Sequence, residues 1–307
     1  MNTNSKIYVA GSSGMVGSSI VRSLIKNKFT NIIRTSRKQL NLLNQSEVLN
    51  FFKKQKFDFV FLCAARVGGI KDNINNKFQF IYDNLQIQNN IINSAFKTGV
   101  QNLIFLGTSC IYPRESKQPI KEEYLLTGPL EMSNQYYSIA KIAGIKLCES
   151  LNIQFKTNYL TVMPTNLYGP NDNYDLDNSH VIPALLSKFH FAKKNNLPEL
   201  VIWGNKNTRR EFLHVDDLAS ACILLMKIKY RKHNIINVGS GEELTIENLA
   251  NLIKYTVNYD GKILYDKNEP IGTPRKLLNS SKILKTGWCP IINLKMGLKS
   301  TYDLEEF

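Results

Sequence analysis

The stretch Ile7-Tyr8-Val9-Ala10-Gly11-Ser12-Ser13-Gly14-Met15-Val16-Gly17 decides the fold. Its first four residues are apolar and predict a buried strand, and the residues from Gly14 to about Lys26 have the pattern of a helix. Glycines at a GxxGxxG spacing join these two elements. They let the backbone turn sharply and approach the pyrophosphate of a dinucleotide, which then lies on the amides at the start of the helix. The stretch predicts a cofactor site at residues 11–17.

Apolar runs alternate with helical patterns, which is typical of a parallel sheet with crossover helices. We expect strands at Ile7–Ala10, Ile32–Thr35, Asp58–Ala64, Leu103–Leu106, Asn158–Val162, Leu200–Trp203 and Ile235–Val238. We expect helices at Tyr82–Thr98, Tyr137–Ser150, Pro183–Lys193 and near Leu218–Met226. Residues Asn166 to Val181 are expected to form a loop, and Thr245 to Phe307 to hold short mixed elements.

These elements predict an α/β protein with a Rossmann-type doubly wound parallel sheet and a smaller C-terminal substrate-binding lobe. We expect residues 1–165 plus about 213–241 to form the NADP-binding domain. The remaining residues, about 166–212 plus 242–307, would form the substrate-binding lobe. The two parts interleave along the chain instead of meeting at one boundary.

Composition limits the classes of partner. The chain has 307 residues and a formal net charge of +14, but its lysines are scattered and form no basic run with interleaved aromatics. This disfavours nucleic acid and leaves an anionic small substrate. The apolar run after the polar N-terminus is too short for a signal peptide or a membrane span, so we expect a cytoplasmic protein with no membrane partner. The five cysteines show no CxxC spacing and indicate neither disulfides nor a metal site.

Three residues suggest hydride transfer with proton handling. Thr108 ends an apolar run, and Tyr137 and Lys141 are four residues apart, so they lie on one face of a helix. A nearby ammonium and a cofactor ribose can lower the pKa of the tyrosine, which then exchanges a proton with a carbonyl oxygen. Cys110 lies two residues after Thr108, where a plain reductase needs no acid or base. It suggests proton transfer at carbon, although a cysteine there could equally be a core residue.

The segment after the second expected strand favours a phosphorylated cofactor. It reads Arg34-Thr35-Ser36-Arg37-Lys38 and lacks the carboxylate that would hold the ribose hydroxyls of NAD. Its cations would attract a 2′-phosphate, so NADP(H) is favoured, with Arg37 as the main candidate. The alternative is a solvated loop end.

The chain resembles the GDP-L-fucose synthases, which are 3,5-epimerase-4-reductases of the extended short-chain dehydrogenase/reductase family. The resemblance runs through blocks that include Gly107-Thr-Ser-Cys-Ile-Tyr-Pro113, Val162-Met-Pro-Thr-Asn-Leu-Tyr-Gly-Pro170, Asn178-Ser-His-Val-Ile-Pro183, Arg210-Glu-Phe-Leu-His-Val-Asp-Asp217 and Gly272-Thr-Pro-Arg-Lys-Leu-Leu278. It implies NADPH-dependent 3,5-epimerisation and 4-keto reduction of GDP-4-keto-6-deoxy-D-mannose to GDP-L-fucose.

The resemblance also implies roles for single residues. Thr108, Tyr137 and Lys141 would be the reductase triad, and Cys110 and His180 the base and acid of epimerisation. Cofactor contacts would further include Leu106, Gly107, Ser109, Pro164, Thr165, Asn166, Leu167 and His180. The GDP end of the substrate would contact Lys188, Trp203 and Arg210. The family forms homodimers through two helices per subunit, for which Tyr82–Thr98 and Tyr137–Ser150 are the candidates.

Two departures from the family pattern leave alternatives open. Ser12-Ser13 stands where a basic residue is frequent, and Ile271 stands where bacterial relatives often have aspartate. A GDP-4-keto-heptose C4 reductase, with or without epimerase activity, is therefore the main alternative. A 4,6-dehydratase is disfavoured because such relatives have carboxylates after the threonine. A non-catalytic redox-sensing protein would have no use for the four residues Cys110, Tyr137, Lys141 and His180.

Overall fold

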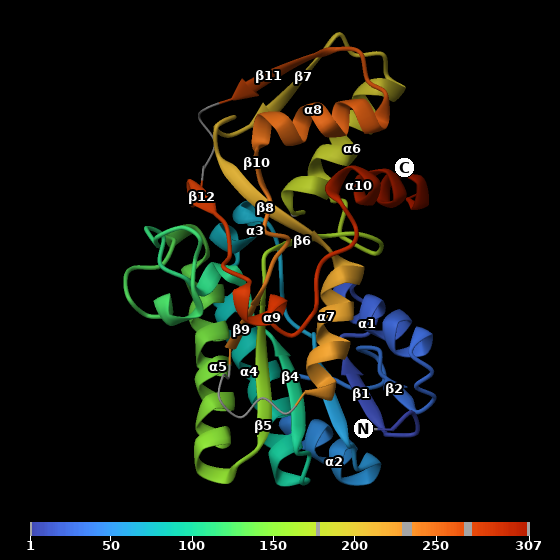
Figure 1. Cartoon of the computed structure of the whole chain (residues 1–307), viewed down its shortest axis with the longest axis vertical. Helices are drawn as coiled ribbons and strands as arrows, with labels where there is room; N and C mark the ends of the chain where they lie inside the picture. Colours follow the sequence, from blue (N-terminus) through green and yellow to red (C-terminus); the bar gives the residue numbers. More distant parts are fainter. Residues whose placement is uncertain (1, 176–178, 229–234, 267–271, 306–307) are drawn as a thin grey trace.

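The main sheet consists of six parallel strands in the order β2-β1-β3-β4-β5-β9 (Figure 1). The computed structural model describes residues 2–175, 179–228, 235–266 and 272–305. The strands are β1 (Ile7–Ala10), β2 (Ile32–Arg34), β3 (Phe59–Leu62), β4 (Asn102–Leu106), β5 (Asn158–Pro164) and β9 (Ile235–Val238). All of their carboxyl ends lie at one edge of the sheet, where ligands of such folds bind.

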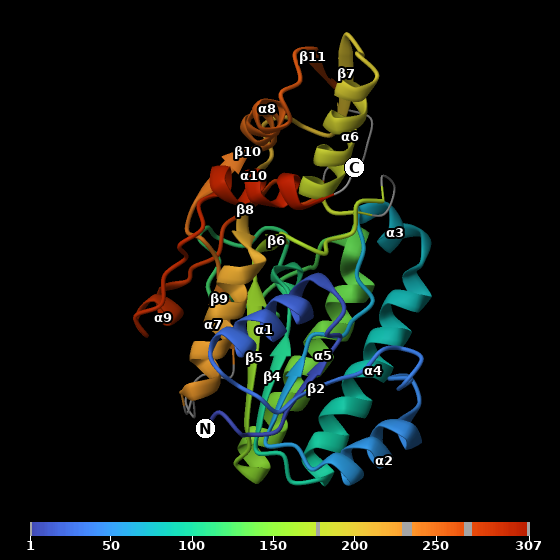
Figure 2. The same ribbon diagram turned by 90° about the vertical axis from the view of Figure 1, so that its right-hand side faces the viewer.

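Helices cover both faces of this sheet (Figure 2). One face carries α1 (Met15–Lys26) and α7 (Val215–Lys227), and the other carries α2 (Gln45–Gln55), α4 (Lys77–Lys97) and α5 (Gln135–Phe155). Successive side chains of a strand point to opposite faces. Ile7 and Val9 of β1 accordingly pack with the first pair of helices, and Tyr8 and Ala10 pack with the other three. Both faces are buried, as the continuous apolar runs predict.

A smaller lobe lies beyond the carboxyl edge of the main sheet (Figure 1). Its central strand, β8 (Arg209–His214), pairs with β6 (Asn166–Tyr168), β10 (Glu243–Thr245) and β12 (Arg275–Lys276). A second pair joins β7 (Glu199–Trp203) to β11 (Lys262–Asp266). Residues from α6 (Val181–Lys194), α8 (Ile246–Val257) and α10 (Leu294–Leu304) form its separate apolar core.

The α/β class and the strands of the main sheet are confirmed, with bounds that differ by a few residues. Two expectations are wrong. Residues Asn166–Tyr168 were expected in a loop but form β6, which pairs in parallel with β8. The region after Thr245 contains two regular helices, α8 with 12 residues and α10 with 11. The chain also forms two unexpected helices, α2 and the six-residue α3 (Ile70–Asn75).

A buried carboxylate joins the main sheet to the smaller lobe. Glu211 of β8 is fully buried, and its carboxylate accepts the N–H groups of Gly241 at 2.7 Å and Leu278 at 3.0 Å. Its carbonyl oxygen accepts hydrogen bonds from the side chains of Thr165 and Asn166. Thus one residue fixes segments that follow β5, β9 and β12.

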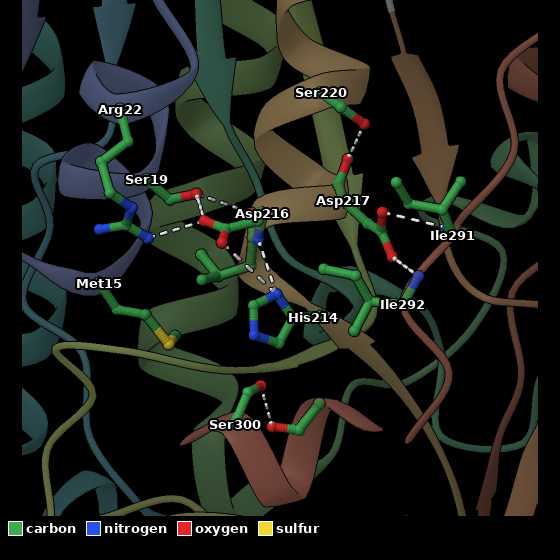
Figure 3. A network of polar contacts seen from close by, with 12 residues as sticks. Met15, Ser19, Arg22, His214, Asp216, Asp217, Ser220, Ile291, Ile292 and Ser300 are labelled. Atoms are coloured by element: carbon green, nitrogen blue, oxygen red, sulfur yellow. Dashed lines mark hydrogen bonds and ion pairs between the residues drawn. The ribbon is translucent and has the colours of Figure 1, made fainter. Parts of the chain in front are cut away.

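A second buried carboxylate holds the C-terminal segment on α7 (Figure 3). Asp217 is 1% exposed and accepts the N–H groups of Ile291 at 3.2 Å and Ile292 at 2.9 Å. Nearby, the indole N–H of Trp288 donates to Ser220 at 2.8 Å. These bonds hold the segment that precedes α10 against α7, so that the chain returns from the main-sheet half to the smaller lobe.

Two kinds of feature are absent from the described residues. None of the helices there is long and apolar enough to cross a membrane. Likewise, no group of three or more His, Cys, Asp or Glu side chains in that part of the chain is placed to hold a metal ion.

Replacing Asp217 with alanine should destabilise the protein strongly. The change removes the charged acceptor of two backbone N–H groups, whose hydrogen bonds together contribute about 3 kcal/mol. We expect the melting temperature to fall by roughly 5 °C or more. Asp303→Ala is the control, because the ion pair that Asp303 makes with Lys299 is exposed. Equal melting temperatures for the two variants would contradict the anchoring role of Asp217.

Candidate active site

The glycine stretch forms a tight turn at the carboxyl end of β1. Gly11 has a φ of +80°, and a Cβ there would lie 2.7 Å from the backbone nitrogen of Ala64. A Cβ at Gly17 would collide with the carbonyl oxygen of Gly11. Helix α1 begins at Met15, immediately after the turn. The turn therefore needs glycine at both positions. Because no side chains project there, a pyrophosphate can approach the backbone at the start of α1.

A cavity of about 470 Å³ opens over this turn. Its lining brings most of the predicted glycine loop together with Arg37 and His180. Thr35, Ser36 and Arg37 line it without a neighbouring carboxylate from the β2 end. Hydroxyls and a guanidinium suit a 2′-phosphate, and the close approach allowed by the glycines suits a pyrophosphate. The residues present thus fit a dinucleotide of the NADP type.

Two predicted cofactor segments lie beside each other at the carboxyl ends of β4 and β5. Leu106 pairs with Val162, and the N–H of Gly107 donates to the Val162 carbonyl at 2.8 Å. The Thr165 N–H donates to the carbonyl oxygen of Val238, and the side-chain amide of Asn166 donates to the carbonyl oxygen of Glu211. The segments 106–109 and 164–167 therefore share the edge of the sheet at which the glycine turn also lies.

Thr108 and Cys110 lie on a short 3₁₀ turn after β4. The turn spans Ser109–Ile111, and the Thr108 hydroxyl accepts the N–H of Cys110 at 3.2 Å. Ser138 of α5 donates to the carbonyl oxygen of Cys110 at 2.9 Å. These bonds fix the Cys110 backbone against the helix that carries Tyr137.

A lysine from the other lobe contacts the Cys110 thiol. The ammonium of Lys276 lies 3.4 Å from Cys110 Sγ, and Lys276 is only 8% exposed. Burial opposes ionisation of Cys110, but the Lys276 charge, hydrogen bonds from Thr108 and Lys276, and the Arg210 charge together outweigh it. The pKa of Cys110 is therefore lowered. A thiol with a lowered pKa supplies more thiolate, which is the basic form.

The same lysine also lowers the pKa of His180, with the opposite consequence for the charge of the group. His180 caps the start of α6 without a side-chain hydrogen bond to that helix, and it lines the cofactor cavity. Burial lowers the pKa of His180, and the charge of Lys276 lowers it further. The protein's own groups therefore favour a thiolate at Cys110 and a neutral imidazole at His180.

Tyr137 and Lys141 lie on α5, as expected from their spacing. Lys141 is 3% exposed and donates to the carbonyl oxygen of Leu106 at 2.7 Å, while its ammonium is 5.8 Å from the centre of the Tyr137 ring. Burial lowers the pKa of Lys141 to about 7. Burial also raises the pKa of Tyr137, and the nearby Cys110 adds to this effect. The protein's own groups therefore do not produce the expected lowering of the Tyr137 pKa.

All three predicted substrate contacts lie on the smaller lobe, and two of them, Lys188 and Trp203, touch each other. The ammonium of Lys188 is 3.9 Å from the centre of the Trp203 ring, and Trp203 is 37% exposed. Arg210 on β8 donates to the Arg209 carbonyl at 2.9 Å, and its charge reaches Cys110. Burial lowers the pKa of Arg210 to about 10, but it remains a cation at neutral pH.

Sequence reasoning missed Lys276. It pairs with Arg210 through the short parallel contact between β12 and β8, and it reaches Cys110 from 166 residues away along the chain. The signal in the sequence was its position within Gly272–Leu278, one of the blocks that carry the family resemblance. Ile271, the residue that departs from the family pattern, lies outside the described residues.

Comparisons with known proteins place this geometry in context. Residues 7–239 match the sequence profile of the NAD dependent epimerase/dehydratase family. GDP-L-fucose synthase 1 from Arabidopsis thaliana is 50% identical over 300 residues, which cover 98% of this chain and 93% of that protein.

Two solved structures are similar over almost the whole chain. A GDP-6-OMe-4-keto-L-xylo-heptose reductase from C. jejuni has a TM-score of 0.93 at 39% identity and covers 99% of this chain and 98% of that one. MlghC, a GDP-mannoheptose C4 reductase from Campylobacter jejuni with NADP bound, has a TM-score of 0.89 at 39% identity, with the same coverage.

Substituting Lys276 with methionine should raise the pKa of Cys110, because the largest charge that favours the thiolate is removed. Each unit by which the pKa rises lowers the thiolate fraction about tenfold at a pH below that pKa. We expect iodoacetamide to modify Cys110 correspondingly more slowly at neutral pH, as measured by mass spectrometry of the Cys110 peptide. Lys285→Met is the control, since Lys285 is exposed. An unchanged pH profile of alkylation in Lys276→Met would show that Lys276 does not control the thiol.

Proposed function

The chain belongs to the NAD dependent epimerase/dehydratase family, and we propose that within it the protein is a GDP-L-fucose synthase. It carries out NADPH-dependent 3,5-epimerisation and 4-keto reduction of GDP-4-keto-6-deoxy-D-mannose to GDP-L-fucose. The identity of 50% with a GDP-L-fucose synthase over nearly the whole chain supports this function. The observation that carries it is the contact of Lys276 with Cys110, which gives a reductase site a base that reduction alone does not need.

Cys110 is proposed as the base of epimerisation. A 4-keto group acidifies the hydrogens at C3 and C5, so the Cys110 thiolate can remove either proton and leave an enolate. His180 returns a proton to the opposite face and inverts the centre. Because burial and Lys276 keep the imidazole neutral, His180 must first take up a proton from the solvent. The negative charge that develops on the enolate favours this uptake.

Tyr137 is proposed to donate a proton to the C4 oxygen during reduction. Its raised pKa keeps the phenol protonated at neutral pH, which is the form that an acid needs. Thr108 holds the same oxygen by a hydrogen bond, and the buried Lys141 positions the cofactor ribose beside Tyr137. Bound NADPH supplies the hydride for C4.

The preference for NADPH over NADH is assigned to the end of β2. Thr35, Ser36 and Arg37 face the cavity and provide hydroxyls and a cation for the 2′-phosphate. MlghC, a structural relative, binds NADP. Ser12 and Ser13 supply no charge, so Arg37 is the main phosphate contact in this proposal.

The substrate is proposed to lie between the main sheet and the smaller lobe. Lys188 and Arg210 provide cations for the diphosphate, and Trp203 offers an aromatic face for the guanine or sugar. Arg210 lies near enough to Cys110 for its charge to act on the thiol. A diphosphate held at Arg210 would therefore place the keto-sugar near Cys110.

A homodimer and a cytoplasmic location complete the proposal. Helices α4 and α5 pack side by side on the outer layer, and both expose apolar side chains. Phe78 and Tyr82 of α4 stack on each other at 5.2 Å and are more than 45% exposed, and Ile139 and Ile153 of α5 are also exposed. Such faces suit a bundle formed with a second copy. The location stays a prediction from the sequence.

A GDP-4-keto-heptose C4 reductase is the second candidate. It is favoured by the TM-score of 0.93 with a heptose reductase, although the identity to that protein is 39%, against 50% for the synthase. Both candidates use the same reductase residues and differ in the sugar accepted.

Product analysis decides between the two candidates. The protein should convert GDP-4-keto-6-deoxy-D-mannose and NADPH to GDP-L-fucose, with deuterium at C3 and C5 when the solvent is D₂O, as followed by NMR. A GDP-4-keto-heptose is assayed side by side as the control substrate. Turnover of the heptose with none of the hexose would overturn the assignment.

Two variants should separate the two reactions. Cys110→Ser should abolish deuterium uptake at C3 and C5, because a hydroxyl at that position is too weakly acidic to act as the base. Tyr137→Phe should slow reduction by about 10² to 10⁴-fold but retain deuterium uptake, because it removes only the acid for C4. Cys289→Ser, which changes an exposed thiol, is the control. Normal uptake in Cys110→Ser would rule out this cysteine as the base.

A further inference from the structure

Two arginines of the described residues line the cofactor cavity, and the proposed function uses one of them. Arg37 follows β2 and is assigned to the 2′-phosphate, whereas Arg66 lies in the segment that follows β3. Gly11 of the glycine turn lies against the backbone of the same segment, since a Cβ built there would be 2.7 Å from the nitrogen of Ala64. Arg66 therefore follows, by two residues, a point that the turn contacts.

The backbone of Arg66 is fixed by one buried amide. Asn84 of α4 is 2% exposed, and its side chain bonds both backbone groups of Arg66. It accepts the N–H at 2.9 Å and donates to the carbonyl oxygen at 3.0 Å. The amide thus satisfies the groups that a neighbouring strand would bond if β3 continued. The side chain of Arg66 extends to the cavity from a fixed point.

The guanidinium of Arg66 is placed by packing and a long ion pair. Its carbon lies 5.4 Å from the centre of the Phe80 ring, and one of its nitrogens is 3.7 Å from the carboxylate of Asp83, beyond the range of a hydrogen bond. Its Nε is buried without a hydrogen-bond partner among the described residues, while 37% of the side chain is exposed. A guanidinium has five N–H donors, so the terminal nitrogens of Arg66 can donate to an anion in the cavity.

The order of the strands places Arg66 near the middle of a bound dinucleotide. β2, β1, β3 and β4 are neighbours in the main sheet, about 4.8 Å apart from one strand to the next. Arg37 follows the first of these strands and Thr108 the last. A cofactor with its 2′-phosphate at Arg37 and its nicotinamide beside Thr108 therefore crosses β1 and β3 with its pyrophosphate. The packing agrees, because the Phe80 ring that contacts Arg66 also meets Tyr137 edge-on, with 6.1 Å between the ring centres.

We propose that Arg66 binds the pyrophosphate of the nicotinamide dinucleotide, together with the amides at the start of α1. Ser12 and Ser13 give the glycine turn no charge, so Arg66 supplies the ionised donor for this anion. Asp83 holds the guanidinium beside the cavity by an ion pair that a phosphate oxygen can replace. The role rests on the proposed function in one respect, the dinucleotide cofactor, and is independent of which sugar is reduced.

Asp83 allows the sign of an effect to be tested. It lines the same cavity and carries its negative charge toward the same anion. With Arg66 on the pyrophosphate, Asp83 competes for the guanidinium and repels the cofactor, so removing the Asp83 charge strengthens binding. An ion pair that only braced the fold would give the same direction of change from either partner. The two halves of the pair therefore separate the two roles.

Isothermal titration with NADPH and with NADH tests the proposal. Arg66→Met should weaken the binding of both about tenfold, the loss expected for a charge-assisted contact that both cofactors make. Arg66→Lys keeps a cation and should bind both to within about threefold of the wild type. Asp83→Asn should bind NADPH up to about fivefold more tightly, which corresponds to the free energy of a partly exposed ion pair.

Two further variants and a second ligand are the controls. Arg37→Met should weaken the binding of NADPH but not of NADH, because NADH lacks the 2′-phosphate. Lys97→Met, at the exposed last residue of α4, should bind both cofactors as the wild type does. GDP, which represents the nucleotide of the substrate, should bind equally to Arg66→Met and to the wild type.

The outcomes separate this proposal from the proposed function. Equal NADPH affinity in the wild type and in Arg66→Met overturns the role of Arg66 and leaves the function standing. A loss for NADPH with none for NADH places Arg66 at the 2′-phosphate and overturns the pyrophosphate contact. A loss in Asp83→Asn as large as in Arg66→Met, or a loss of GDP affinity in Arg66→Met, shows a structural ion pair and also overturns the proposal. Wild-type protein that binds neither cofactor overturns the proposed function as well.

Discussion

The buried carboxylate of Glu211 is the contact on which the site depends. It binds backbone N–H groups that follow β9 and β12, and the carbonyl oxygen of the same residue holds two side chains that follow β5. Burial raises the pKa of Glu211, while these N–H donors oppose the rise. Leu278, two residues after Lys276, packs in the core of the main-sheet half and forms a bridge with Ile120. Glu211 adds a polar connection to the same segment, and together these contacts position Lys276 at Cys110.

One cation, Lys276, acts on the pKa of two site residues. Lys276 lowers the pKa of Cys110 and that of His180, and the consequences differ because one group becomes charged on losing its proton and the other becomes neutral. Burial acts on Tyr137 and Lys141 in the direction of the neutral form for both. The thiol is thus shifted toward its charged form, and the acid for C4 keeps its proton.

The sequence predicted the main sheet and the placement of Tyr137 and Lys141 on one helix because those signals are local. Apolar runs mark buried strands wherever both faces are covered, and the Tyr137–Lys141 spacing requires only a helix. The missed features depend on contacts between distant segments. β6 has three residues and exists because it pairs with β8, and Lys276 is an ordinary lysine until the fold brings it to Cys110. Nothing in the residues next to Lys276 indicates this contact.

The proposed reactions share one carbonyl group, and this sets their order. The C4 ketone acidifies C3 and C5 because the electron pair left by a departing proton delocalises onto its oxygen. Reduction removes the ketone and with it that acidity, so Cys110 must act before Tyr137 gives its proton to the C4 oxygen. The structure suits this order, since Lys276 favours the thiolate while burial retains the proton of Tyr137. A reductase that released its proton early would trap the sugar before its centres had inverted.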